Sequence, residues 1–246
     1  MSRILITIPT WNEAVVIERN LGVAVDATRR LFPNDVVIIE VADNASTDET
    51  SEIVYRVTVE NPASVLLREL EEKGKGLAIR SSWQAHVEDS DVLVFMDADL
   101  AADLNALPQL IRPIVNGEQD LVCGSRFLPG SRIQRAWHRE LASRLYRGLQ
   151  QMILGLPVAD AQCGFKAVSA QAAKRLLPLC SETGWLFDSE LIAVAAKKGL
   201  RIAEIPVAWI EHRDPSRRSA LRLFRHGWGF IAGLLRISAK VSQIKP

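Results

Sequence analysis

The chain has 246 residues, of which 48% are hydrophobic and 24% are charged, and its formal net charge is +1. This length suits one large α/β domain or two small ones, and this composition excludes a chain that is disordered throughout. No apolar stretch reaches the ~18 residues of a membrane-spanning helix, and the short apolar run Ile4–Ile8 does not resemble a signal peptide. Three cysteines without metal-ligand spacing predict buried thiols in a reducing compartment.

The first half of the chain alternates short apolar runs with helical stretches. Strands are predicted at Ile4–Ile8, Val36–Val41, Val65–Leu67 and Asp91–Met96. This alternation predicts an α/β fold with a doubly wound, mostly parallel sheet and helices on both faces. Right-handed crossovers bring the four loops that follow these strands to one edge of the sheet, where ligands of such sheets bind.

The second half is less regular. A fifth strand is predicted at Asp120–Cys123, and residues 160–166 lead to a helix that ends near Pro178, with no strand predicted between them. Another helix is predicted from Gly184 to Lys198, with Gly199 as its C-terminal cap.

Two carboxylates leave the fourth predicted strand together, in the sequence Asp97-Ala98-Asp99. Carboxylate oxygens at the mouth of such a sheet are hard ligands that suit Mg²⁺ or Mn²⁺ shared with substrate phosphates. The alternative interpretation is an ordinary polar turn.

Two other loops add groups that suit a nucleotide. Asp43 follows the second strand and is able to accept hydrogen bonds from a ribose or a base, although it is also typical of a helix cap. Lys73 and Lys75 alternate with glycines, which favours close approach to a phosphate but also describes a flexible turn. The three loops together predict a nucleotide-diphosphate site.

The C-terminal end is strongly basic. Residues 211–246 contain eight Lys or Arg and two acidic residues, so this segment carries +6 and the remainder of the chain −5. At about 100° per residue, the basic residues after Leu221 share one narrow face, and apolar and aromatic residues fill the rest. The pattern predicts an amphipathic helix in a membrane interface, with packing on the body or dimerisation as alternatives. No nucleic-acid recognition motif accompanies the arginines.

Motifs along the chain resemble the family 2 inverting glycosyltransferases of the GT-A fold. In the first half these are Ile8–Glu13, Asp43–Asp48, Lys73–Gly76 and Met96–Leu100. In the second half, a further set resembles the dolichyl-phosphate or polyprenyl-phosphate β-glucosyltransferase branch, to which dolichyl-phosphate mannose synthases are related: Gly124–Arg126, Asp160–Lys166, Gly184–Glu190 and Glu204–Trp209. The resemblance covers about residues 3–218, so residues 1–218 are expected to form the GT-A domain and 219–246 the membrane-interface segment.

The resemblance implies roles for the donor-side residues. Asp97 and Asp99 would bridge Mg²⁺ or Mn²⁺ to the donor diphosphate, and Lys75 would lie near the donor. Four residues would hold the nucleoside: Pro9, Asn12, Glu13 and Asp43.

For the remaining site residues, the resemblance implies roles at the sugar and the acceptor. Arg126 would face the acceptor or donor phosphates, and Gln162 would line the sugar pocket. Asp188 would be the catalytic carboxylate, with a helix N-cap as the alternative. Arg217 would close over the donor, in a loop where Pro215 stands in place of the relatives' glycine.

The resemblance therefore implies a metal-dependent hexosyltransferase that moves glucose from UDP-glucose onto a polyprenyl phosphate. It would work as a peripheral protein on the cytoplasmic face of the membrane. The alternatives are a relative that uses GDP-mannose or a non-lipid acceptor, and a non-catalytic nucleotide-sugar-binding protein. The presence of Asp97, Asp99 and Asp188 disfavours the non-catalytic alternative.

Overall fold

A computed structural model describes residues 1–134, 137–210 and 227–245. Within these residues, the main sheet has the strand order β3-β2-β1-β4-β7-β5-β8. Its strands are β1 (Arg3–Thr10), β2 (Val36–Asp43), β3 (Val65–Glu69), β4 (Val92–Met96), β5 (Leu121–Ser125), β7 (Phe165–Ser169) and β8 (Ile202–Pro206). All run parallel except β7, which is antiparallel to both of its neighbours. A separate parallel pair joins β6 (Arg132–Gln134) to β9 (Ala208–Ile210).

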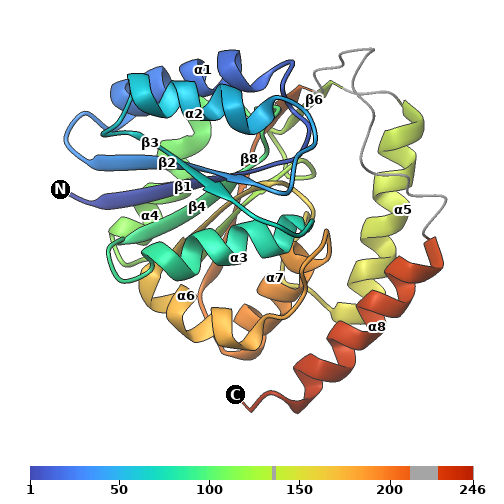
Figure 1. The fold of residues 1–246 in the computed structure, drawn as a ribbon. Helices are drawn as coiled ribbons and strands as arrows, with labels where there is room; N and C mark the ends of the chain where they lie inside the picture. Colours follow the sequence, from blue (N-terminus) through green and yellow to red (C-terminus); the bar gives the residue numbers. More distant parts are fainter. Residues whose placement is uncertain (135–136, 211–226, 246) are drawn as a thin grey trace.

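Helices cover both faces of the main sheet and bury two apolar cores (Figure 1). One face carries α1 (Ile17–Leu31), α2 (Thr50–Glu60) and α4 (Leu107–Val115). The other face carries α3 (Lys75–His86), α6 (Ala170–Leu176) and α7 (Phe187–Lys197). Short 3-10 turns occupy Leu104–Ala106 and Leu177–Leu179. The doubly wound architecture predicted from the alternating pattern is confirmed, because continuous apolar strands such as β4 are buried on both sides.

Two further helices extend one side of this layered body. The helices α5 (Trp137–Leu154) and α8 (Gly227–Gln243) pack against each other, and α8 also contacts α7 (Figure 1). Tyr146 on α5 and Phe230 on α8 meet edge to face, with ring centroids 5.6 Å apart. No helix in the described part of the chain has the length and hydropathy to cross a bilayer.

The structure corrects several details of the sequence interpretation. The central strand β7 was not predicted. The first helix begins at Ile17, four residues beyond Glu13, and has no side-chain N-cap. Gly199, by contrast, follows α7 with a left-handed φ of 66°, as predicted for a C-terminal cap.

The predicted C-terminal helix is present as α8, but its setting differs from a helix that lies only on a membrane. Leu234 and Ile237 are buried in the core of the body. Arg236 pairs with Glu182, and Lys240 donates to Glu190 at 2.7 Å. The proposed boundary between residues 218 and 219, and the basic residues Arg222, Arg225 and His226, lie outside the described residues.

Candidate active site

The order of the strands places a topological switch point between β1 and β4. From β1 the chain proceeds outward to β2 and β3, whereas β4 is added on the opposite side of β1. In doubly wound sheets, such a reversal opens a ligand crevice beyond the carboxyl ends of the two strands. Pro9 lies near the carboxyl end of β1, the loop with Asn12 and Glu13 leaves the strand there, and Asp97 follows β4 directly.

The loops after β1 and β2 are joined into one wall. The backbone N–H of Asn12 donates to Ser46 Oγ at 2.9 Å, and Asn12 Oδ1 accepts from the Thr47 N–H at 2.8 Å. The Glu13 N–H donates to Thr50 Oγ1 at 2.8 Å. Asn12 holds a left-handed φ of 54°, which an Asn adopts more readily than most residues. Asn12 and Glu13 are therefore positioned by loop-to-loop contacts.

Asp43, at the end of β2, is buried and already engaged. Its Oδ2 accepts from the Ser46 N–H at 3.1 Å and from Ser51 Oγ at 2.9 Å, and its Oδ1 accepts from Ser46 Oγ. The carboxylate therefore shapes the turn that leads into α2. Contact of Asp43 with a nucleoside stays a prediction.

The glycines beside Lys75 pack against the protein itself. A Cβ on Gly74 would lie 2.3 Å from the Thr183 carbonyl oxygen, and one on Gly76 would lie 2.6 Å from Phe187 Cβ. Only glycine therefore allows the start of α3 to approach the segment before α7 so closely. This contact gives a structural reason for both glycines, and approach of the loop to a phosphate stays a prediction.

A buried chain of charges lies below the crevice. Lys75 Nζ is 2.9 Å from Asp97 Oδ1 and 3.5 Å from Asp188 Oδ2. Lys166 Nζ, on β7, is 2.6 Å from Asp188 Oδ1. Burial alone lowers the pKa of each lysine, but the adjacent carboxylates outweigh it, so both pKa values lie above their usual range and both lysines are charged at neutral pH.

Asp188 lies inside the protein, between the two lysines of this chain of charges. Its side chain is buried, and its two oxygens face Lys166 and Lys75. The alternative role as a helix N-cap is wrong, because α7 begins at Phe187 and makes no side-chain cap bond. The geometry makes Asp188 a group that holds Lys75 against Asp97.

Asp97 is held at the edge of the crevice by its neighbours. Its N–H donates to the Gly164 carbonyl at 3.1 Å, and a Cβ on Gly164 would lie 2.0 Å from Asp97 Oδ2. Asp97 and Asp99 are both partly exposed, and Asp99 Oδ1 accepts from the Ala101 N–H at 3.2 Å.

These two carboxylates suit a divalent ion that shares its ligands with a phosphate. Within the described residues, no group of three His, Cys, Asp or Glu is arranged to hold a metal alone. Mg²⁺ commonly takes one or two protein carboxylates together with substrate phosphates and water. The donor set therefore fits a metal that arrives with a diphosphate.

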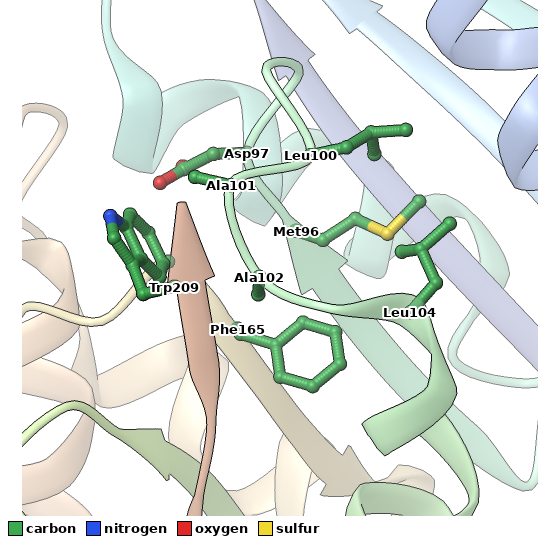
Figure 2. A pocket seen from close by; sticks show the side chains of 9 residues that line it. Met96, Asp97, Leu100, Ala101, Ala102, Leu104, Phe165 and Trp209 are labelled. Carbon is green, nitrogen blue, oxygen red and sulfur yellow. The ribbon is translucent and has the colours of Figure 1, made fainter. Parts of the chain in front are cut away.

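A small apolar pocket supports Asp97 from below. Asp97 and Trp209 lie at one side of it, and Met96, Leu100 and Leu104 line the opposite side (Figure 2). The interior has no room for a water molecule. The pocket is therefore packing beneath the carboxylate and not a binding cavity.

Arg126, directly after β5, is locked to Asp160. Its Nε and terminal nitrogen donate to the two Asp160 oxygens at 2.7 and 2.9 Å, and its guanidinium lies 4.9 Å from the centre of the Trp209 ring. Burial opposes ionisation of both groups, but the pair outweighs it: the pKa of Arg126 is raised and the pKa of Asp160 is lowered. Arg126 is therefore a positioning residue whose donors face mainly another side chain.

A basic cavity of about 490 Å³ lies beside Arg126. Arg147 stacks over Phe127 at 4.9 Å, and Arg144 pairs with Glu140 at 2.7 Å. The lining residues are Arg126, Phe127, Leu128, Ser131, Ile133, Glu140, Arg144 and Arg147. Asp160 offsets Arg126 and Glu140 offsets Arg144, so the three guanidinium groups still outnumber the two carboxylates beside them, which favours an anionic occupant.

Two predicted site residues remain, Gln162 and Arg217. Gln162 Nε2 donates to Ser189 Oγ at 3.0 Å, next to Asp188. Arg217 lies outside the described residues. Sequence reasoning missed the pairing roles of Lys166 and Asp160, although both stand in one of the motifs quoted above.

The fold and the crevice define a doubly wound α/β protein that suits a nucleotide diphosphate and a divalent ion. The family model described as Glycosyl transferase family 2 matches residues 5–177. The chain therefore belongs to glycosyltransferase family 2.

Curated relatives match nearly the whole chain. Glycosyltransferase AglD from Haloferax volcanii is 32% identical over 231 residues, which cover 94% of this chain but 36% of that protein, so the chain spans about a third of its length. Undecaprenyl-phosphate mannosyltransferase from Micrococcus luteus is 30% identical, and the match covers 85% of this chain and 84% of that protein. Dolichyl-phosphate beta-glucosyltransferase ALG5C from Trichomonas vaginalis is 28% identical, and the match covers 96% of this chain and 69% of that protein.

Solved structures share the fold. Glucosyl-3-phosphoglycerate synthase from Mycobacterium tuberculosis, in complex with UDP, superposes with a TM-score of 0.67 at 25% identity, covering 97% of this chain and 80% of that one. The same enzyme in complex with Mn²⁺, UDP-glucose and phosphoglyceric acid gives a TM-score of 0.67 at 24% identity, which supports the fold alone.

Proposed function

We propose that this protein is a metal-dependent inverting glycosyltransferase that transfers glucose from UDP-glucose to a polyprenyl or dolichyl phosphate. The observation that carries the proposal is the partly exposed Asp97/Asp99 pair at the switch point, backed by Lys75 and Gly164 and next to a basic cavity. The relatives named as dolichyl-phosphate glucosyltransferase and undecaprenyl-phosphate mannosyltransferase support this acceptor class.

The donor would bind along the carboxyl ends of β1, β2 and β4. The nucleoside would lie against Pro9, Asn12, Glu13 and Asp43, whose loops are already joined by hydrogen bonds. Asp97 and Asp99 would hold Mg²⁺ or Mn²⁺ with the diphosphate, where the ion offsets charge on the leaving nucleotide. Gln162, fixed by Ser189, would line the sugar.

The acceptor phosphate would enter the basic cavity beside Arg126. Arg144 and Arg147 line it, while Asp160 keeps the Arg126 guanidinium in place. A phosphate monoester is largely ionised at neutral pH, so its attack needs little help from a base. Asp188 then contributes by holding Lys75 against Asp97, rather than by removing a proton.

The protein would work as a peripheral enzyme on the cytoplasmic face of the membrane. The basic segment 219–246 would contribute by attraction to anionic lipids. Arg217, in the preceding loop, would bind donor phosphate, since a guanidinium does so in a bidentate manner.

A second candidate donor is GDP-mannose, which the similarity to the mannosyltransferase of Micrococcus luteus favours. Calorimetric titration with UDP-glucose and with GDP-mannose, each with and without Mn²⁺, separates the two. Metal-dependent heat with UDP-glucose alone is the expected result. Heat with GDP-mannose alone would move the proposal to mannosyl transfer, and no heat with either donor would contradict it.

A further inference from the structure

The helix α5 has a packed face that fixes its orientation on the body. Leu149 and Ile153 pack against the core, and Tyr146 packs there as well and meets Phe230 of α8. The buried Gln150 donates to Ser189 Oγ at 2.6 Å. These contacts leave the opposite sides of α5 at the surface.

A second set of large apolar side chains lies on α5 away from this packed face. Leu141, Leu145 and Met152 are 52%, 68% and 82% exposed. At 3.6 residues per turn they fall within an arc of about 40° and extend along roughly 16 Å of the helix. Gly148 lies about 20° beyond one edge of this arc, and a Cβ placed on it meets nothing within 4 Å. We call Leu141, Leu145, Gly148 and Met152 the α5 stripe.

The α5 stripe lies next to the basic cavity. Arg144 and Arg147 fall on the flank of α5 between 60° and 150° from the centre of the stripe, by about 100° per residue, and both line the cavity. Arg144 is exposed, and its Nε donates to Glu140 within the same flank. One helix thus presents bare hydrocarbon beside guanidinium groups, which matches the chemistry of an anionic lipid surface.

The basic side chains described on α8 are less available for such a surface. Arg236 is paired with Glu182, and Lys240 reaches the buried Glu190. Leu234 is fully buried. Leu235 of α8 is 55% exposed.

We propose that the α5 stripe is the surface through which this protein lies on an anionic bilayer, with the basic cavity facing the lipid headgroups. This inference deepens the proposed function and rests on it, since it states how a lipid-borne phosphate reaches the cavity. Exposed apolar side chains gathered in one stripe, with basic residues beside them, favour an interfacial helix over a solvated one.

The test is co-sedimentation of the whole protein with vesicles of phosphatidylcholine and phosphatidylglycerol. The double variant Leu145→Ser/Met152→Ser removes the centre of the stripe and should lower the partition coefficient about tenfold or more. The matched control is Tyr55→Ser/Val59→Ser on α2, where the side chains are 62% and 64% exposed, and it should bind like wild type. Equal binding of both double variants, or no binding by wild type, would overturn the proposal.

A second measurement leaves most of the stripe intact. The emission maximum of an environment-sensitive fluorophore on Met152→Cys should shift to the blue when vesicles are added. The emission maximum of the same fluorophore on Val59→Cys should not shift. The native thiols Cys123, Cys163 and Cys180 are free and buried, and burial raises their pKa values, so labelling is selective. Equal shifts at both positions would contradict the assignment.

Two controls separate this inference from its alternatives. Vesicle binding needs no substrate, and the stripe variant should keep the wild-type heat with UDP-glucose and Mn²⁺. Vesicle binding that depends on the α5 stripe, in a wild-type protein that binds neither donor, would contradict the proposed function and leave the lipid surface standing. A wild-type dimer that becomes monomeric in the stripe variant, with vesicle binding unchanged, would assign the stripe to a second copy and overturn the proposal.

Discussion

At the scale of single residues, the site depends on charges that neutralise one another inside the protein. Asp97, Lys75, Asp188 and Lys166 form one chain of ion pairs that starts at the crevice and ends on β7. Removal of one partner from a buried ion pair is strongly destabilising, because the remaining charge is left without compensation. These ion pairs therefore link the position of Asp97, the proposed metal-binding carboxylate, to the stability of the fold.

Lys166→Met should destabilise the protein strongly. The substitution leaves the Asp188 carboxylate buried with Lys75 as its charged partner at 3.5 Å, and breaking a buried pair typically costs ~3–5 kcal/mol. Urea unfolding followed by circular dichroism measures the loss. Lys174→Met, which breaks an exposed pair with Glu88, is the control and should change stability little. Similar midpoints for the two variants would refute the role of the buried pair.

Gly164→Ala should weaken metal-dependent donor binding. The new Cβ would lie 2.0 Å from Asp97 Oδ2, so the carboxylate must move away from its present place. Disturbing the support of a metal ligand typically costs about 10–100-fold in affinity. Calorimetry with UDP-glucose and Mn²⁺ measures the effect, and Gly148→Ala, where a Cβ meets nothing, should bind the donor normally. Unchanged donor affinity in Gly164→Ala would argue against Asp97 as a ligand.

At the scale of elements, Arg126 and Asp160 join the end of β5 to the loop before β7. Glu204 on β8 extends this junction, because its carboxylate accepts from the N–H groups of Ala159 and Asp160. The junction fixes the wall of the basic cavity. It also makes part of the stability depend on pH.

Asp160→Asn should reduce the free energy of unfolding by an amount that depends on pH. Because the pKa of Asp160 is lowered in the folded state, the pair contributes fully above the ordinary carboxyl pKa of 3.8 and loses its contribution as pH falls through the lower folded value. The difference in the free energy of unfolding between wild type and variant should be constant near neutral pH and should shrink below about pH 3.8. Denaturant midpoints between pH 7 and pH 2.5 measure it, and a gap that persists to the acid end would contradict the assignment.

The docking of α8 depends on a close contact at Gly233. A Cβ there would lie 2.2 Å from Leu186 Cδ1, whereas a Cβ on Gly229 meets nothing. Gly233→Ala should therefore lower the thermal midpoint through overpacking, at ~1–3 kcal/mol. Gly229→Ala should raise it slightly, because alanine favours the helix by about 1 kcal/mol. Equal shifts in the same direction would show that α8 does not pack as described.

At the scale of the molecule, the local pattern of apolar runs and polar loops was enough to predict much of the fold. The strands β1 to β4 are predictable because each is a continuous apolar run followed by a polar loop, and parallel pairing brings those loops to one edge. The clustering of Pro9–Glu13, Asp43 and Asp97 at that edge follows from the topology alone.

What the sequence did not reveal depends on partners far along the chain. The central strand β7 contains Lys166, a charge that is tolerated there only because Asp188 on α7 neutralises it. The periodicity of α8 identified its apolar residues and left packing on the body as one alternative, but it did not show which of them, such as Leu234, pack there. Helical spacing shows which residues share a face and does not show what covers it.

The most direct test of the account is transfer of radiolabelled glucose from UDP-glucose to a polyprenyl phosphate, measured in the organic extract. Wild type with Mn²⁺ should label the lipid, and removal of the metal with EDTA should stop the labelling. Asp99→Asn should reduce the labelling to background, because the Asp97/Asp99 pair is the proposed metal site. Labelling at the wild-type rate by Asp99→Asn, or in the presence of EDTA, would contradict the account.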